Sequence, residues 1–245
     1  MAMDAPILAL DKISKRFGAI VIAEEVDLAL AAGESLGIIG PNGAGKTTLF
    51  GMVSGTVAPD SGRVLYDGRD ITGAAPAQRC RIGIGRSFQI PLPFSGMSVF
   101  ENLVVAAAFG GSRHERDVYD RCMEILQRCG LADKANRPAA SLALLDRKRL
   151  ELARALATDP RLLLLDEVAG GLTERECHAL IELIGEVRRG GVSIIWIEHV
   201  VHALVASIDR LLVLHNGGFI AEGDPQTVLR SPQVAEIYLG IEADA

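Results

Sequence analysis

Eight consecutive residues, from Gly40 to Thr47, read Gly-Pro-Asn-Gly-Ala-Gly-Lys-Thr. They match G-x-x-x-x-G-K-[ST], the pattern of a loop that binds phosphate groups. In such a loop, small residues let backbone N–H groups turn inward around a phosphate, and the next helix adds its N-terminal donors and dipole. We expect Lys46 to reach the β- and γ-phosphates of a nucleotide, the Thr47 hydroxyl to coordinate Mg²⁺ and Thr48 to donate to the α-phosphate. The predicted nucleotide-binding residues of this segment are Gly40, Pro41, Asn42, Gly43, Ala44, Gly45, Lys46, Thr47 and Thr48.

The context of this loop agrees with the motif. An apolar run from Leu36 to Ile39 precedes it and predicts a strand, and a helical pattern follows from about Thr47 to Val53. A glycine-rich turn that matched by chance would need neither element. The arrangement therefore favours phosphate binding over a chance match.

Two adjacent carboxylates follow a second apolar run. Residues Leu162 to Leu165 predict a buried strand that ends in Asp166 and Glu167. Ligands of open α/β sheets bind beyond such strand ends, and side chains alternate in direction along a strand. We expect Asp166 to hold the metal and Glu167 to orient or deprotonate an attacking water. An acidic loop entrance or a helix cap is the alternative, which the phosphate loop elsewhere in the chain disfavours.

Two more polar side chains follow predicted strands. Gln89 comes after residues 82–87 and could ligate the metal through its amide oxygen, and His199 comes after residues 194–197 and could contact the γ-phosphate. Neither identifies a site by itself. Glu198, His199 and His202 form only a weak metal pattern because a further ligand at suitable spacing is missing. The predicted metal ligands are Thr47, Gln89 and Asp166, and the predicted catalytic residues are Lys46, Glu167 and His199.

Strands and helices alternate around these residues, which implies an α/β fold with a parallel sheet buried on both faces. Further strands are expected at 7–10, 26–30, 63–66, 193–197 and 210–215, and helices at 173–189, at 200–207 and after Asp224 and Ser231, with helical character from 99 to 158. The early strands predict an antiparallel β edge, and residues 90–160 predict a helical insertion. We therefore expect a single domain over residues 1–245.

Composition and charge indicate which classes of protein the sequence can belong to. The 245 residues are 49% hydrophobic and 23% charged, as in ordered globular proteins. A formal charge of −6 argues against nucleic-acid binding, and the basic run Arg147-Lys148-Arg149 is interpreted as a solvated helix face. The sequence lacks a secretory signal at Met1–Asp4 and any apolar run of about 18 residues. The four cysteines show no C-x-x-C pair, so we expect free thiols in a reducing cytoplasm.

The phosphate loop, Gln89, the helical insert, Asp166-Glu167 and His199 occur in an order that resembles the nucleotide-binding subunit of ATP-binding-cassette (ABC) transporters over nearly the whole chain. This resemblance implies a P-loop NTPase (RecA-like) core that binds ATP and Mg²⁺ and hydrolyses ATP. It also implies Phe17 as the aromatic residue stacked on adenine, Gln89 as the glutamine that senses a transmembrane subunit, and His199 as the switch histidine. Gly170-Gly171-Leu172 lies where the family's D-loop should begin.

Within the family, the chain looks most like the ATP-binding subunits of branched-chain amino acid importers. The phrases that carry this likeness are Gly85-Arg86-Ser87-Phe88-Gln89, Arg149 to Leu156, Ile197-Glu198-His199 and Tyr238-Leu239-Gly240. Related importers carry amides, urea or aromatic acids, so these cargoes stay open. The implied partners are transmembrane permease subunits, a second ATP-binding subunit and, indirectly, a substrate-binding protein, at the cytoplasmic face of the membrane.

One departure from the family concerns its signature loop, usually Leu-Ser-Gly-Gly-Gln. It aligns here with Leu142, Ala143, Leu144, Leu145 and Asp146. Ala143 lacks the hydroxyl that grips a γ-phosphate, and two leucines obstruct close approach of the backbone. Asp146 is expected to cap a helix that starts at Arg147. The departure predicts an asymmetric heterodimer in which a different subunit supplies the working signature loop.

Other functions remain as alternatives. A soluble ABC-type ATPase of translation or DNA repair would carry tandem cassettes or a coiled-coil insert, whereas this sequence has one cassette and no heptad run. A P-loop kinase would not need Gln89, the Asp166-Glu167 pair and His199 in this order. For a transporter subunit, the surface from Ile90 to Phe100 is expected to receive a short helix of a membrane subunit, with Glu101 important for assembly.

Overall fold

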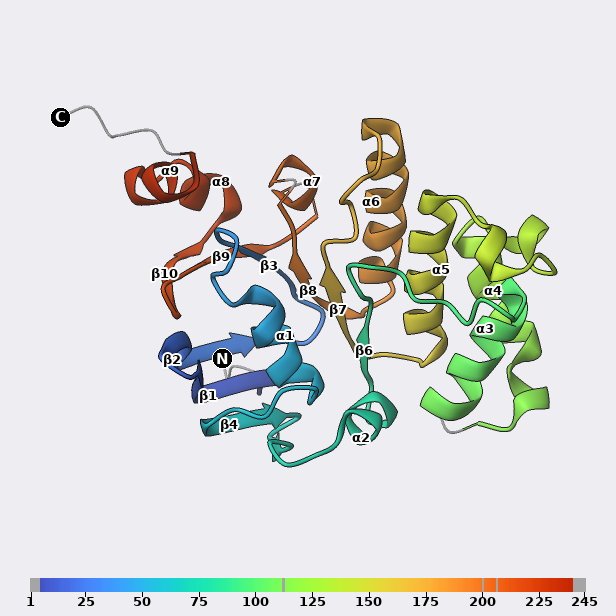
Figure 1. Cartoon of the computed structure of the whole chain (residues 1–245), viewed down its shortest axis with the longest axis horizontal. Helices are drawn as coiled ribbons and strands as arrows, with labels where there is room; N and C mark the ends of the chain where they lie inside the picture. Colours follow the sequence, from blue (N-terminus) through green and yellow to red (C-terminus); the bar gives the residue numbers. More distant parts are fainter. Residues whose placement is uncertain (1–4, 112, 200, 206, 240–245) are drawn as a thin grey trace. The chain divides into compact units, whose positions relative to one another are not determined.

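The computed structural model describes residues 5–111, 113–199, 201–205 and 207–239 (Figure 1). The chain divides into two compact units, one made of residues 1–75 and 193–245 and the other of residues 76–192. Val200, expected to begin a helix, and Gly240, part of the family-like ending, lie outside the described residues, as do Met1–Asp4.

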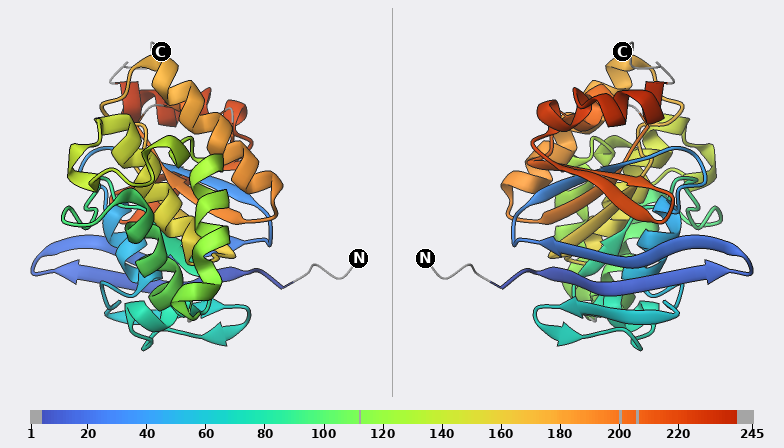
Figure 2. Two further views of the ribbon diagram at one scale, coloured as in Figure 1. Left: turned by 90° about the vertical axis from the view of Figure 1, so that its right-hand side faces the viewer. Right: turned by 90° about the vertical axis from the view of Figure 1, so that its left-hand side faces the viewer.

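The first unit contains a four-stranded antiparallel sheet in the order β2-β1-β4-β5. Its two long strands form a hairpin that pairs from Leu8 with Leu30 to Phe17 with Ile20 (Figure 2). Both strands extend past the apolar runs expected at 7–10 and 26–30, because cross-strand hydrogen bonds continue through polar residues with several register shifts. The strands are β1 (Leu8–Phe17), β2 (Ile20–Leu30), β4 (Ser61–Tyr66) and β5 (Arg69–Asp70).

The same unit contains a parallel set of strands with β3 (Ser35–Ile39) at its centre. β3 pairs in parallel with β8 (Ser193–Ile197) and β9 (Arg210–His215), and β10 (Gly218–Gly223) pairs antiparallel with β9. Every residue of β3 and β8 is buried, as expected of parallel strands covered on both faces. The helices of the unit are α1 (Lys46–Ser54), α7 (Val201–Val205), α8 (Pro225–Leu229) and α9 (Pro232–Leu239).

The second unit joins two parallel strands to a set of helices. β6 (Ile84–Arg86) pairs with β7 (Leu162–Asp166), whose five residues are all buried. The helices are α2 (Pro76–Arg81), α3 (Val99–Val105), α4 (Tyr119–Arg128), α5 (Leu144–Ala157) and α6 (Glu174–Arg189). Between them lie a π-helical turn, η1 (Ala106–Gly110), and the 3₁₀ turns Glu115–Val118, Ala132–Lys134 and Ala139–Ser141. The helical stretch expected at 99–158 is therefore several helices separated by tight turns.

Side chains at the N-termini fix the starts of α3 and α6. Ser98 and Glu101 form a reciprocal capping box at α3, and Thr173 and Glu176 form another at α6. Each box satisfies backbone N–H groups that the first helical turn leaves without a partner. The capping box explains why α6 begins within one residue of the expected start.

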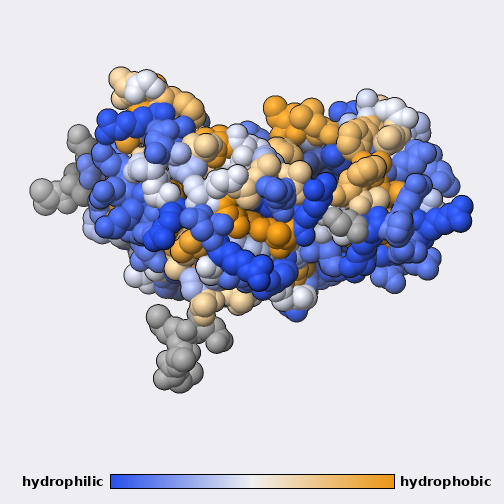
Figure 3. All heavy atoms as spheres, turned by 90° about the horizontal axis from the view of Figure 1, so that it is seen from below, coloured by the Kyte–Doolittle hydropathy of each residue, from blue (hydrophilic) through white to orange (hydrophobic). Residues whose placement is uncertain are grey.

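Apolar side chains on the face shown in Figure 3 form separate patches among hydrophilic ones. Separate patches of this kind are ordinary for a protein surface. Among the described residues, no helix combines the length and apolar character needed to cross a bilayer.

Candidate functional site

The phosphate loop of the first unit leaves little room for side chains at two of its glycines. A Cβ atom on Gly40 would lie 2.2 Å from the Leu214 carbonyl oxygen. One on Gly45 would lie 2.7 Å from Ile22 Cγ2, and Gly45 also has a φ of 98°, which favours glycine. The loop therefore has a tight backbone path that its sequence pattern alone only suggested.

Lys46 is the first residue of α1, and its side chain is buried. Its ammonium group donates to the Gly40 carbonyl at 2.7 Å and to the Pro41 carbonyl at 3.0 Å. The charge thus lies within the loop, beside the N-terminus of a helix whose first turn carries no acidic residue. Thr47 is exposed and Thr48 half-buried, so the Thr47 hydroxyl is accessible to a ligand. Backbone donors, an ammonium and a hydroxyl around a glycine-lined path fit a polyphosphate.

His199 leaves the sheet at the same edge as the phosphate loop. β3 and β8 run parallel, with Ile38 opposite Ile197, so the residues that follow both strands emerge together. The His199 side chain is exposed, whereas Glu198 is buried and accepts from Trp196 Nε1 at 3.3 Å and the His199 N–H at 3.2 Å. Glu198 therefore stabilises the strand end and leaves His199 at the surface.

The weak metal pattern around Glu198 and His199 gains no support. In the described part of the chain, no three or more His, Cys, Asp or Glu side chains are grouped so that they could hold a metal ion. The side chain of His202 lies outside the described residues.

Phe17 ends β1 with its ring half-exposed. The Lys15 ammonium lies 5.2 Å from the ring centroid, within the range of a cation–π contact. An exposed, oriented aromatic ring is suited to stacking on a planar ligand.

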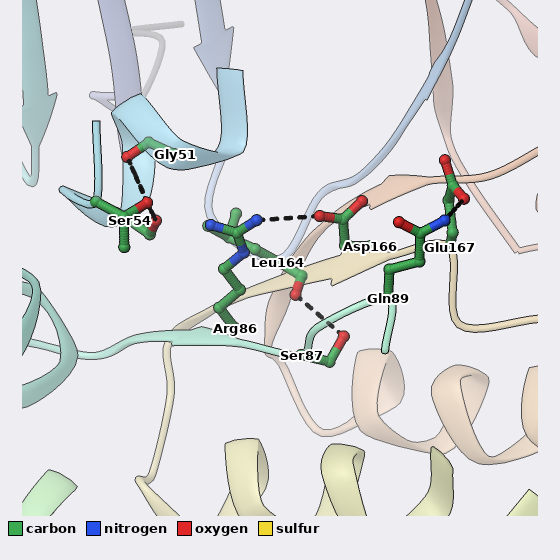
Figure 4. Close-up of polar contacts among 9 residues, drawn as sticks. Gly51, Ser54, Arg86, Ser87, Gln89, Leu164, Asp166 and Glu167 are labelled. Carbon is green, nitrogen blue, oxygen red and sulfur yellow. Dashed lines mark hydrogen bonds and ion pairs between the residues drawn. The ribbon is translucent and has the colours of Figure 1, made fainter. Parts of the chain in front are cut away.

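The carboxylates of the second unit lie at the end of β7, with Asp166 as its last residue and Glu167 directly after it (Figure 4). Gln89 follows β6, and its Nε2 donates to Glu167 Oε2. Asp166 is buried and accepts from Arg86 Nη2 at 3.0 Å. The two carboxylates point to different partners, as strand alternation requires. Glu167 also has a φ of 47°, an uncommon conformation for a residue other than glycine and one that occurs at functional sites.

The predicted metal ligands offer the chemistry that Mg²⁺ prefers. Thr47 supplies a hydroxyl oxygen, Gln89 an amide oxygen and Asp166 a carboxylate oxygen. Mg²⁺ binds hard oxygen donors and keeps several waters, so a small set of protein ligands is sufficient.

Two residues of this site were not singled out from the sequence. Arg86 was noted only as part of a family-like phrase, yet it pairs with Asp166 across 80 positions of the chain. Lys148 was interpreted as part of a solvated face, and this was wrong: it is 5% exposed, and its ammonium donates to the Glu167 carbonyl oxygen at 3.2 Å. Helical periodicity gave a usable signal, since Lys148 lies four and seven positions before the buried Leu152 and Ala155 on α5.

Comparison with known proteins identifies the family. The model of the ABC transporter family matches residues 23–170. The chain is 37% identical to the high-affinity branched-chain amino acid transport ATP-binding protein LivG of Salmonella typhimurium, over 97% of this chain and 99% of that protein. It is 34% identical to the corresponding protein BraF of Pseudomonas aeruginosa, over 97% and 99%. The chain belongs to the ABC transporter family.

Solved structures agree with this assignment. The ADP conformation of MJ1267, an ATP-binding cassette of an ABC transporter, matches with a TM-score of 0.89 and 32% identity, over 96% of this chain and 99% of that one. A nucleotide-free ATP-binding cassette from an ABC transporter matches with a TM-score of 0.87 over 96% and 100%. The predicted P-loop NTPase fold, with its antiparallel β edge and helical insertion, is confirmed, as is the prediction of an ABC-type ATPase.

The segment aligned with the ABC signature loop forms the start of α5. The helix begins at Leu144 with Ala143 as its N-cap residue, so the expectation that Asp146 caps a helix from Arg147 was wrong. Asp146 lies in the first turn, where its charge suits the helix dipole, and pairs with Lys134 at 2.7 Å. The helix starts one turn earlier than expected because leucines are good helix formers.

Proposed function

We propose that this chain is the ATP-hydrolysing subunit of an importer for branched-chain or chemically related amino acids. The observation that supports this choice of transported substrate is the 37% identity to LivG across almost the whole of both chains. Amides, urea or aromatic acids remain alternative cargoes.

In this proposal, residues of the first unit bind the nucleotide. In the first unit, backbone N–H groups from Gly40 to Thr48 and the Lys46 ammonium bind the phosphates, and the Phe17 ring stacks on adenine. His199 contacts the γ-phosphate from the end of β8. These roles are supported by the glycine-lined loop, the buried Lys46 and the exposed ring of Phe17.

In the second unit, Glu167 orients and deprotonates the attacking water, and Gln89 fixes the Glu167 carboxylate through the hydrogen bond between their side chains. Asp166, Gln89 and Thr47 hold Mg²⁺. The ion neutralises charge on the phosphates when bound. Arg86 pairs with Asp166 and so orients this buried carboxylate.

The transporter partners follow from the same likeness. Permease subunits bind the segment between β6 and α3, whose apolar side chains are exposed, with Ile90 at 70% and Leu92 at 71%. A substrate-binding protein delivers the cargo, and the chain works at the cytoplasmic face of the membrane. The units at 1–75 with 193–245 and at 76–192 together make the nucleotide-binding domain, with the helical insertion at about 90–160.

Glu101 is a poor choice for testing that surface. Its carboxylate accepts the Ser98 N–H at 2.7 Å, so charge reversal would break the cap of α3 as well as alter the surface. Ile90→Asp and Leu92→Asp change only exposed side chains. We expect both to reduce co-purification with permease subunits and to leave ATP binding unchanged.

The degenerate signature-like loop supports a heterodimer. Ala143 offers no hydroxyl, and the Leu144 side chain, half-exposed at the start of α5, lies where a glycine would leave the backbone open. The partner subunit supplies the working signature loop for the phosphates bound here.

The deciding experiment compares ATPase activity of the wild type and Glu167→Gln, each in the complex with permease subunits and a second ATP-binding subunit. We expect activity to fall by about 10²- to 10⁴-fold in the variant, the range for a lost general base, with ATP affinity retained. Glu182→Gln, an exposed carboxylate on α6, is the matched control and should retain full activity. Equal activity of wild type and Glu167→Gln would reject Glu167 as the base.

A further inference from the structure

The segment that carries Gln89 has no regular structure, and it runs from the end of β6 to the start of α3. Its apolar side chains at alternate positions, Phe88, Ile90, Leu92 and Phe94, are exposed. A segment of this kind needs anchors on its inner side to hold one conformation.

Glu151, in the middle of α5, supplies one anchor. The side chain is 5% exposed, and the backbone N–H groups of Phe88 and Leu92 lie close enough to its carboxylate to lower its pKa. Burial raises the pKa of Glu151, and Arg154 and the two backbone donors oppose this shift. A buried carboxylate is costly unless it is paired and hydrogen-bonded, and Arg154 supplies the ion pair.

Arg154, one turn further along α5, supplies the second anchor. Its Nη1 donates to Glu151 Oε2 at 3.0 Å and to the Leu92 carbonyl at 3.0 Å. Its guanidinium carbon lies 5.0 Å from the centroid of the Phe94 ring. The ion pair therefore holds the Leu92 carbonyl through a hydrogen bond and contacts the Phe94 ring.

Gln89 lies between these fixed points. Phe88 precedes it, Leu92 follows three positions later, and its own amide reaches Glu167. We propose that Glu151 and Arg154 are positioning residues that hold the 88–92 backbone so that Gln89 can orient Glu167. This inference rests on the proposed role of Glu167 as general base.

The far end of the segment has a separate anchor. The buried Asn102 of α3 accepts the Phe94 N–H at 2.8 Å and donates to the Phe94 carbonyl at 3.1 Å. Loss of the Glu151–Arg154 pair should therefore loosen residues 88–92 and leave Phe94 in place. A purely structural pair would instead affect the packing of α5 as a whole.

The test uses Glu151→Leu/Arg154→Met, because replacing a buried ion pair by apolar side chains of similar size preserves stability in other proteins. Hydrogen exchange on the full-length chain should show the Phe88 and Leu92 amides exchanging about tenfold faster or more, while amides of α5 and of Phe94 keep their protection. In the transporter complex, kcat should fall by about 10- to 100-fold, as for a misplaced catalytic group, with the KM for ATP changed by less than about threefold.

Two further variants sharpen this test. Arg154→Lys keeps the charge beside Glu151 but loses the planar contact with Phe94, so its kcat should lie between those of the wild type and the double variant. Arg113→Met removes an exposed ion pair with Asp159 in the same unit and should change neither the exchange nor the kcat.

Unchanged exchange at Phe88 and Leu92 in the double variant would overturn the anchoring. Faster exchange with an unchanged kcat would overturn the positioning role. A wild-type complex without ATPase activity, or with activity that Glu167→Gln retains, would overturn the proposed function, and the exchange result would still decide the anchoring.

Discussion

At the scale of single residues, the phosphate loop depends on glycines at positions that have no room for a side chain. Gly40 lies against the carbonyl of a neighbouring strand, and Gly45 has a left-handed conformation and contacts Ile22. Lys46 can sit inside the loop because the backbone follows this narrow path.

Gly40→Ala should therefore damage the loop. A Cβ atom 2.2 Å from the Leu214 oxygen forces the backbone to move, which we expect to cost about 1–3 kcal/mol of stability and to weaken ATP binding. Urea unfolding and ATP titration check both effects. Gly73→Ala is the control, since its Cβ would meet no described atom within 4 Å, and its stability should change by less than about 0.5 kcal/mol. Equal losses in the two variants would contradict the steric argument.

The four free cysteines differ in burial, and this predicts their reactivity. Burial raises the pKa of the Cys122 thiol to about 11 and that of Cys129 to about 12. At pH 8 about one Cys129 in ten thousand is thiolate, the reactive form. We expect iodoacetamide to modify the half-buried Cys80 first and Cys129 only after unfolding, as read by peptide mass spectrometry. Alkylation of Cys129 in the native chain at the rate of Cys80 would count against the buried site.

The sequence predicted the residues that form motifs and missed those that act across the chain. Gly40–Thr48 and the Asp166–Glu167 pair are visible because each is contiguous and follows an apolar strand. Arg86 and Lys148 could not be recognised in the same way, because their partners lie 80 and 19 positions away. A charged residue on a helix is easily taken as solvated unless its position is compared with the apolar face of that helix.

At the scale of elements, the bounds of strands were predicted well where nearly all residues of the strand are buried. β8 and β9 match their expected bounds because each contains a short apolar run of β-strand length between helical segments. α2 and β5 were missed because six and two residues are too few to show periodicity. α8 and α9 begin directly after Asp224 and Ser231, as expected, because proline suits the first position of a helix.

The capping box of α6 predicts a pH dependence of stability. The hydrogen bond from the Thr173 N–H, with that from its hydroxyl, lowers the pKa of Glu176 below 4.5. A carboxylate with a depressed pKa stabilises the fold above its unfolded pKa, and this contribution is lost as pH falls through the folded value. We therefore expect wild type to be more stable than Glu176→Gln at pH 7 and the difference to vanish as pH falls well below 4.5.

Urea unfolding at several pH values between 7 and 3.5 measures this difference. Glu182→Gln removes an exposed carboxylate of the same helix that lies outside the cap, so it controls for the loss of one charge. A gap between wild type and Glu176→Gln that stayed constant down to pH 3.5 would argue against the ionised cap.

At the scale of the whole molecule, α5 links three parts of the second unit. Its first turn forms the signature-like loop, Lys148 contacts the Glu167 backbone, and Glu151 with Arg154 holds the segment that carries Gln89. A change at the start of this helix is therefore placed to affect Glu167 and Gln89 in the same unit.

The first turn of α5 is where a heterodimer can be distinguished from a homodimer. Ala143→Ser/Leu144→Gly/Leu145→Gly/Asp146→Gln restores the family's loop, with a hydroxyl and an open backbone that can hold the γ-phosphate of a second copy. We expect the wild-type chain alone to hydrolyse ATP weakly. The fourfold variant alone should gain about 100- to 1,000-fold, the scale of oxyanion-type donors, with a rate that rises steeply with protein concentration.

Two control variants test whether the gain in ATPase activity comes from the restored loop. Adding Glu167→Gln to the fourfold variant should abolish the gain, and Leu144→Gly/Leu145→Gly alone should give less of it, because the backbone is open but the hydroxyl is missing. Each glycine costs about 1 kcal/mol of helix stability, so thermal unfolding must show that α5 survives the change. If the wild-type chain alone already matches the rate of the assembled transporter, the leucine-containing loop is competent and the subunit works as a homodimer.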